Sequence, residues 1–209
     1  MTDDRLSRQL AFVLELDKLK TVLRQTLLTD SSRRENDAEH SWHVAAMALL
    51  LGEYAPAGVD PARAAKMLLF HDVVEIDAGD TFIHDEAGNA TKAAREQAAA
   101  ERLYGMLPPD QGREFKALWQ EYEDRATPTA QFADALDRLQ PIMNNFATGG
   151  GTWRPNGVTA DKVFGLVERI AAGAPALGDY ARALVEEAVR RGYLAPAAIP
   201  HAPSSTAKG

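Results

Sequence analysis

Apolar residues recur along most of the chain at the three- and four-residue spacing of amphipathic helices. The first stretch keeps this spacing from Leu10 to Leu27 and predicts one long helix. No segment alternates with the two-residue period of a strand, and no internal repeat is present. The predicted helices cover residues 4–28, 38–54, 61–77, 89–106, 111–124, 128–146, 159–172 and 179–191. The pattern therefore predicts an all-α fold, a single bundle of about seven or eight helices.

Capping and turn residues separate these helices. Asp37 is the expected N-cap of the second helix, and Asp60 followed by Pro61 starts the third. The glycine-rich segment Gly149–Gly157 is longer than most connections between helices, and it is either an ordinary surface loop or a lid over a site. Residues 1–194 are expected to form one domain. Residues 195–209, rich in Pro, Ala, Ser and Thr, are expected to form a disordered tail.

Composition narrows the class of protein. The chain has 209 residues, 45% of them hydrophobic, which suits one domain with a sizeable core. A net charge of −7 with no Lys/Arg run disfavours a nucleic-acid polymer or a membrane surface as partner. The absence of cysteine excludes disulfides, thiolate metal sites and a cysteine nucleophile. The polar start of the chain is no signal peptide, so a cytoplasmic location is expected.

Four candidate catalytic or metal-binding side chains lie close together at the end of the third predicted helix. An apolar run leads directly into His71 and Asp72, and Glu75 and Asp80 follow within ten residues. Helical spacing brings His71, Asp72 and Glu75 toward one face. Crowded carboxylates are unfavourable unless a cation or a proton lies among them. A His-Asp pair alone is more often a buried histidine beside a capping aspartate, so this segment needs support from elsewhere in the chain.

Two further helices supply candidates of the same kind. His40 and His43 lie three residues apart at the start of a strongly apolar helix, and either is a possible metal ligand or a structural histidine. Asp134 and Asp137 lie three residues apart within another apolar helix. They are either possible metal ligands or part of a solvated acidic face. Each pair is weak evidence by itself. The order of all three motifs along the chain is more specific.

That order, His40, then His71-Asp72, then Asp137, resembles the signature of the HD superfamily of metal-dependent phosphohydrolases. The local form His-Asp-x-x-Glu-x-x-x-Gly-Asp at residues 71–80 resembles the 5′-deoxynucleotidases within it. The resemblance covers about residues 16–146. It implies four metal ligands, His40, His71, Asp72 and Asp137, and two catalytic acids, Glu75 and Asp80. It also implies a homodimer, because relatives are often dimers.

The resemblance extends to an arginine that holds the substrate phosphate. Arg24 falls near that position, although Gln25 stands where some relatives carry an aromatic residue. Arg33 and Arg34, in the next polar segment, are the alternative phosphate contacts. A solvated surface role is equally open for these arginines.

The implied cofactor is one divalent metal ion per site. Two imidazoles and two carboxylates suit Mn²⁺, Co²⁺, Fe²⁺, Ni²⁺ or Mg²⁺ better than structural zinc. The implied activity is a metal-dependent phosphomonoesterase, a 5′-nucleotidase that hydrolyses ribo- or deoxyribonucleoside 5′-monophosphates to nucleoside and phosphate. An HD-type phosphodiesterase or a nucleotide triphosphohydrolase is the alternative among enzymes. A non-catalytic nucleotide-binding module is the alternative outside them, and Glu75 and Asp80 argue against it because binding alone does not require them.

Overall fold

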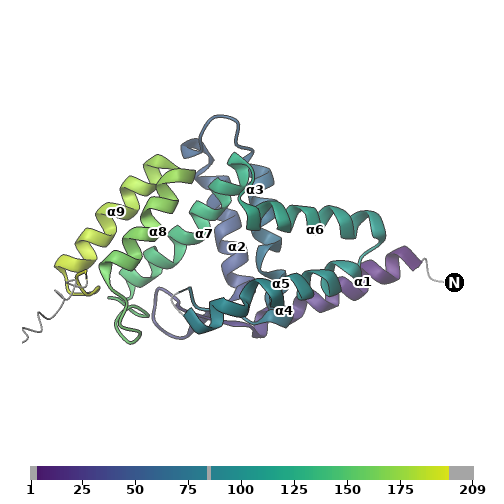
Figure 1. Cartoon of the computed structure of the whole chain (residues 1–209), viewed down its shortest axis with the longest axis horizontal. Coiled ribbons are helices and arrows are strands. Elements are labelled where there is room, and N and C mark those ends of the chain that lie inside the picture. Colours follow the sequence, from purple (N-terminus) through teal and green to yellow (C-terminus); the bar gives the residue numbers. More distant parts are fainter. Residues whose placement is uncertain (1–3, 84–85, 198–209) are drawn as a thin grey trace, which may run out of the picture.

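The computed structural model describes residues 4–83 and 86–197, except for the side chain of Glu86. This part of the chain is helical apart from one two-stranded sheet, which confirms the all-α prediction (Figure 1). Its helices are α1 (Asp4–Leu16), α2 (Asp37–Leu50), α3 (Pro61–Phe70), α4 (Glu75–Ala78), α5 (Glu86–Gly105), α6 (Pro109–Asp124), α7 (Pro128–Ala147), α8 (Ala160–Gly173) and α9 (Pro175–Arg190). The strands are β1 (Leu23–Leu27) and β2 (Arg34–Asn36), and the short 3-10 helices are η1 (Asp17–Thr21), η2 (Gly52–Tyr54) and η3 (His71–Val74).

The long first helix of the sequence prediction is wrong in its second half. α1 ends at Leu16, and β1 then pairs antiparallel with β2. Helical spacing of leucines does not exclude a strand when a partner strand is available in the fold. The Arg34 side chain adds to this pairing by donating hydrogen bonds to the backbone oxygens of Leu23 and Arg24.

The third predicted helix is real, but it changes geometry where the candidate residues begin. α3 ends at Phe70, and η3 and α4 follow without a loop. The hydroxyl of Tyr104 donates a 2.9 Å hydrogen bond to the Phe70 carbonyl oxygen, which satisfies a backbone acceptor at this change. The tight turn of η3 carries His71 and Asp72, and both side chains are buried.

Helix starts show which capping signals were decisive. Asp60 caps α3 as the sequence predicts, and Thr127 caps α7. The predicted cap Asp37 is wrong, because Asn36 forms the N-cap of α2 in a capping box with Glu39. The last helix begins at Pro175, four residues before the predicted start, since proline is favoured in the first turn of a helix.

Buried residues form two separate cores. The larger core is built by α2, α3, α7, α8 and α9, and includes Leu68, Phe132 and Leu136. The smaller core is built around α1, η3, α4 and α5, and includes Val73 and Leu103. In Figure 1, α8 and α9 lie on one side of the central α2, α3 and α7, while α1, α5 and α6 extend to the other. α3 ends in the larger core and η3 enters the smaller one, so the candidate segment lies at their junction.

The connection between α7 and α8 is fixed by hydrogen bonds. The Asn145 side-chain oxygen accepts from the backbone N–H and the hydroxyl of Thr152, and the Gly150 N–H donates to the Asn145 carbonyl. Trp153 is buried against the larger core. The segment is therefore packed onto the end of α7, and the lid role of Gly149–Gly157 remains a prediction.

The C-terminal end of the described chain contacts the start of α8. The Ala160 N–H donates to the carbonyl of Ala195, and Thr159 and Ala195 form an isolated bridge. Most of the predicted tail, residues 198–209, lies outside the described residues, as does His84. Among the described residues, no helix is long and apolar enough to span a membrane.

Candidate metal centre and active-site cavity

Three elements bring the four predicted ligands together. His40 lies on the first turn of α2, His71 and Asp72 lie on η3, and Asp137 lies in the middle of α7. His40 Nε2 is 2.8 Å from Asp137 Oδ1 and 4.0 Å from Asp72 Oδ2. His71 Nε2 is 3.1 Å from Asp72 Oδ1 and 3.7 Å from Asp137 Oδ1. Residues up to 97 positions apart thus converge on one buried point.

The donor atoms suit a divalent cation. The side chain of His71 is fixed by Nδ1, which lies 2.8 Å from the carbonyl oxygen of Leu68, so Nδ1 carries the proton. Its Nε2 has no hydrogen-bond partner among the described residues and faces the two carboxylates. Ligand atoms of His40, His71 and Asp72 lie within 4.8 Å of one another. Imidazole nitrogens and carboxylate oxygens in this arrangement can hold a metal ion.

Two groups interact with Oδ2 of Asp137, the oxygen that does not face the histidines. The Tyr122 hydroxyl donates a 2.7 Å hydrogen bond to Asp137 Oδ2, and Arg138 Nη2 lies 3.5 Å from the same oxygen. Burial opposes the charge on Asp137, but the charge of Arg138, the hydrogen bond with His40 and the nearby His71 ring outweigh it and hold the pKa well below its usual range. Asp137 is therefore an ionised, oriented carboxylate. Asp134 on the same helix instead forms a two-point ion pair with Arg169.

His40 is enclosed between two carboxylates. Its Nε2 faces Asp137, and its Nδ1 lies 3.5 Å from Glu35 Oε2. Burial and Arg24 oppose a charge on this ring, but the interactions with Asp137 and Glu35 prevail and raise the pKa of His40 to about 9. The metal-free centre therefore favours a proton where a cation would bind.

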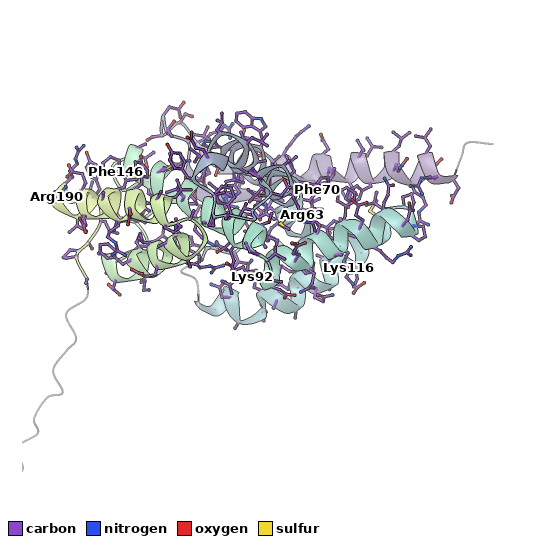
Figure 2. The ribbon with its side chains drawn as sticks, turned by 90° about the horizontal axis from the view of Figure 1, so that it is seen from above. Arg63, Phe70, Lys92, Lys116, Phe146 and Arg190 are labelled. Carbon is purple, nitrogen blue, oxygen red and sulfur yellow. The ribbon has the colours of Figure 1, made fainter. Side chains whose placement is uncertain are left out.

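Glu75 is a buried acid beside the centre. Burial first, and then the charge of Asp72, raise the pKa of Glu75 to about 10. Glu75 Oε1 is 3.8 Å from Lys92 Nζ, and Oε2 has no hydrogen-bond partner among the described residues. Lys92 also pairs with Glu96 one turn along α5. Figure 2 shows Lys92 near the middle of the molecule, away from the end marked by Arg190.

Arg24 lies among carboxylates on the other side. Its Nη1 is 2.9 Å from Asp72 Oδ2, 3.5 Å from Asp37 Oδ1 and 3.7 Å from Asp80 Oδ1. Burial raises the pKa of Asp80 above its usual range, and burial together with Asp72 raises that of Asp37 to about 8. Arg24 therefore lies within reach of several carboxylates at once, and it approaches the centre from β1.

These groups open into a cavity of about 280 Å³. Arg24, His71, Asp72, Glu75, Asp80 and Asp137 line it, together with Lys92, Tyr122, Arg138, Trp153, Leu166 and Arg169. Arg33 and Arg34 are not among its lining residues. Arg33 forms an ion pair with Glu39, and Arg34 binds backbone oxygens of β1. The structure brings Arg24 into the cavity and leaves the other two arginines outside it, so their phosphate contacts remain a prediction.

Sequence reasoning missed several groups that surround the centre. Glu35, Asp37, Lys92 and Tyr122 have no motif of their own in the sequence. Glu35 and Asp37 carried one signal, since both lie within five residues of the predicted ligand His40. Lys92 and Tyr122 carried none, because only the packing of α5 and α6 brings them near. His43 is half-buried, and its Nδ1 lies 3.3 Å from Gln140 Nε2, outside the ligand set.

Comparison with known proteins identifies the class. The family model described as HD domain matches residues 16–178, so the chain belongs to the HD domain family. A solved structure described as a predicted metal-dependent phosphohydrolase from Magnetospirillum magnetotacticum is 68% identical. It has a TM-score of 0.89 and covers 92% of this chain and 97% of its own. The family and this relative make the chain a hydrolase that uses a divalent metal ion.

Curated relatives are more distant. The 5′-deoxynucleotidase HDDC2 of Danio rerio is 29% identical over 139 residues, which is 66% of this chain and 68% of that protein. The 5′-deoxynucleotidase of Erwinia tasmaniensis is 32% identical over 148 residues, 66% of this chain and 74% of that protein. The chain thus spans about two thirds or slightly more of these relatives. The PH0347 protein of Pyrococcus horikoshii, at 20% identity and a TM-score of 0.57, supports the fold alone.

Proposed function

We propose that this chain is a metal-dependent 5′-nucleotidase that hydrolyses ribo- or deoxyribonucleoside 5′-monophosphates to a nucleoside and phosphate. The observation that carries the proposal is the convergence of His40, His71, Asp72 and Asp137, the last three of which line the cavity. Glu75, Asp80 and Arg24 line the same cavity. The names of the curated relatives, 5′-deoxynucleotidases, support the substrate class.

In this proposal the four converging residues hold one divalent cation, with Mn²⁺, Co²⁺, Fe²⁺, Ni²⁺ and Mg²⁺ as candidates. When bound, the cation supplies Lewis acidity, which offsets phosphate charge and makes a nearby water more acidic. Arg24 binds phosphate oxygens through charge-assisted hydrogen bonds. Its head group already lies beside Asp72 and Asp80, so a phosphate there would take over part of the charge compensation that these acids now provide.

Glu75 and Asp80 carry the proton transfers. Glu75 accepts the proton of the attacking water as the water oxygen forms a bond to phosphorus. The phosphorus–O5′ bond breaks, and Asp80 donates a proton to the departing alkoxide. Burial raises the pKa of both carboxyls, and this lets Asp80 keep a proton to donate. The ionised form of Glu75, which a base requires, would be favoured by the positive charge of a bound cation.

The charges of the cavity favour a monophosphate over a triphosphate. Four basic side chains line it, Arg24, Lys92, Arg138 and Arg169. Each of them already faces a carboxylate among the described residues. A triphosphate brings more negative charge than these groups can offset, whereas one phosphate requires only the cation and Arg24. The volume of about 280 Å³ also suits a small substrate.

The proposal is tested by phosphate release from a panel of ribo- and deoxyribonucleoside 5′-monophosphates. The purified protein is loaded in turn with Mn²⁺, Co²⁺, Ni²⁺ or Mg²⁺, and Glu75→Ala is assayed in parallel. We expect release that depends on the metal and disappears in the variant. If the protein hydrolyses only a phosphodiester or only a nucleoside triphosphate, it is a phosphodiesterase or a triphosphohydrolase instead. If the protein binds metal but hydrolyses no phosphate ester, it is a non-catalytic nucleotide-binding module.

We also propose that the chain forms a homodimer in the cytoplasm and binds no nucleic-acid polymer or membrane. The support for a dimer is the outer face of α1, where Leu6, Leu10, Val13 and Leu14 are all at least half exposed. These residues follow one helical face, and an exposed apolar stripe of this kind is typical of an interface. Light scattering coupled to gel filtration measures the assembly, and Leu10→Asp with Leu14→Asp should yield a monomer.

A further inference from the structure

Three buried polar atoms lie close together behind the metal centre. Glu35 Oε2, His40 Nδ1 and Arg24 Nε all lack a hydrogen bond among the described residues. Glu35 Oε2 is 3.5 Å from His40 Nδ1 and 3.8 Å from Arg24 Nε. Unpaired buried groups are destabilising, and these three are within a small displacement of pairing with one another. We therefore expect them to pair in the working state of the protein.

The position of Glu35 is set by its neighbours. It lies on β2, which pairs with the strand that carries Arg24 and leads into the helix that carries His40. The side-chain amide of Gln140, on α7, donates a 2.8 Å hydrogen bond to Glu35 Oε1. Glu35 is only 2% exposed, so water does not compete for its second oxygen. One carboxylate oxygen is thus fixed by Gln140, and the other points between His40 and Arg24.

We propose that Glu35 is a positioning residue shared by the metal ligand His40 and the phosphate-binding Arg24. Its Oε2 accepts the Nδ1 proton of His40, which leaves the Nε2 lone pair for the cation. The same oxygen accepts the Nε proton of Arg24, which directs the two terminal nitrogens of the guanidinium group toward the cavity. The inference rests on the proposed function, because that function gives His40 and Arg24 their roles.

One consequence is coupling between two ligands. The cation fixes the His40 side chain and the phosphate fixes the Arg24 side chain. Both side chains donate a hydrogen bond to the Glu35 carboxylate. A bound cation thus orients Arg24 for phosphate binding through Glu35, and a bound phosphate orients His40 for cation binding through the same residue. Thermodynamic linkage requires the two effects on affinity to be equal. Glu35 acts through other residues and touches neither the cation nor the phosphate.

The variant Glu35→Gln tests this role, since it retains the shape and the oxygen that accepts from Gln140. Calorimetry measures the affinity for Mn²⁺ alone, and then the affinity of the Mn²⁺-loaded protein for inorganic phosphate. We expect Mn²⁺ affinity to fall roughly 10–100-fold and phosphate affinity to fall as well, while the metal-free protein stays folded by circular dichroism. The matched control is Glu121→Gln, which loses a carboxylate that accepts from Arg63 and Thr127 outside the cavity. It should bind both ligands as the wild type does.

Wild-type affinity of Glu35→Gln for either ligand would overturn the shared role. Failure of the wild-type chain to bind Mn²⁺ would instead contradict the proposed function itself. If Glu35→Gln does not fold, nitrogen-15 NMR of the wild-type histidine rings decides, with Zn²⁺ as a diamagnetic probe. A His40 ring protonated at Nδ1, with a hydrogen-bonded proton, is the expected result. A ring protonated at Nε2 would overturn the inference.

Discussion

Tyr122 donates a 2.7 Å hydrogen bond to Asp137 Oδ2, while Asp137 Oδ1 faces His40 Nε2 at 2.8 Å. The two oxygens of one carboxylate therefore have different partners. The phenol occupies the outer oxygen and leaves the inner one directed at the centre. Both residues are buried, so this division is not averaged by exchange with water.

Tyr122→Phe removes this hydrogen bond and keeps the ring. Asp137 is then free to rotate, and we expect the affinity for Mn²⁺ to fall roughly tenfold, because groups that orient a metal ligand contribute about this much. Calorimetric titration of the metal-free protein with Mn²⁺ measures the change. Tyr54→Phe, on η2 and outside the cavity lining, is the control and should bind Mn²⁺ as the wild type does. Equal affinity of Tyr122→Phe and wild type would contradict the orienting role.

Asp137→Asn replaces the ionised carboxylate with a neutral amide of the same shape. The pKa of Asp137 is held low by Arg138 and its histidine partners despite burial, so this position contributes a full negative charge. We expect the variant to lose most bound metal when it is measured by elemental analysis after gel filtration. Asp134→Asn, which breaks the ion pair with Arg169 on the same helix, should keep its metal. Unchanged metal content in Asp137→Asn would exclude Asp137 from the ligand set.

Glu75→Gln separates chemistry from metal binding. An amide cannot accept the proton of the attacking water, and general acid–base catalysis typically contributes about 10²–10⁴ in rate. We expect kcat on a nucleoside monophosphate to fall by that factor while metal content stays at the wild-type level. Full activity of the variant would show that another group, or no group, takes this proton.

Glu75 also predicts how stability depends on pH. Its pKa is raised by burial and by Asp72 from 4.5 to about 10, so the folded metal-free chain keeps a proton that the unfolded chain releases. The unfolding free energy therefore falls as pH rises from about 4.5 toward about 10. Glutamine does not ionise, so Glu75→Gln should gain stability relative to wild type between about pH 5 and pH 8.5. Urea denaturation at both pH values measures this gain, and an identical difference at each pH would contradict it.

Gly150 tests how firmly the α7–α8 connection is fixed. Its φ is +90°, and an added Cβ would lie 2.1 Å from the Tyr193 carbonyl oxygen. Gly157 also has a positive φ, +59°, but an added Cβ there meets no atom within 4 Å. Gly150→Ala should therefore lower the unfolding free energy by clearly more than Gly157→Ala, which carries only about 1 kcal/mol of backbone strain. Similar losses in thermal denaturation would show that the connection yields easily, as a lid does.

Helical periodicity predicted most of the fold because most helices here pack one apolar face on a core. It failed at residues 17–28, where Leu19 is buried as a helix would require but Leu23 is half exposed. The chain leaves the helix there because β2 offers a partner strand, and that partner is not visible in local spacing. Periodicity also merged α3, η3 and α4, since a 3-10 turn changes the spacing too little to appear in the apolar pattern.

The centre was predictable for a different reason. Histidines and aspartates inside apolar helices stand out, and four of them converge as the order of motifs predicts. The groups that orient them do not stand out. Tyr122 resembles any core aromatic residue, and Lys92 resembles any surface lysine of a charged helix. Only packing of α5 and α6 against η3 and α7 gives these two residues their partners.

The junction of the two cores has a mechanical consequence. His40 and Asp137 belong to helices of the larger core, while His71 and Asp72 begin the segment that enters the smaller one. A cation held by all four would join the larger core to the smaller one at this point. The loss of the cation would therefore remove a direct link between the two cores.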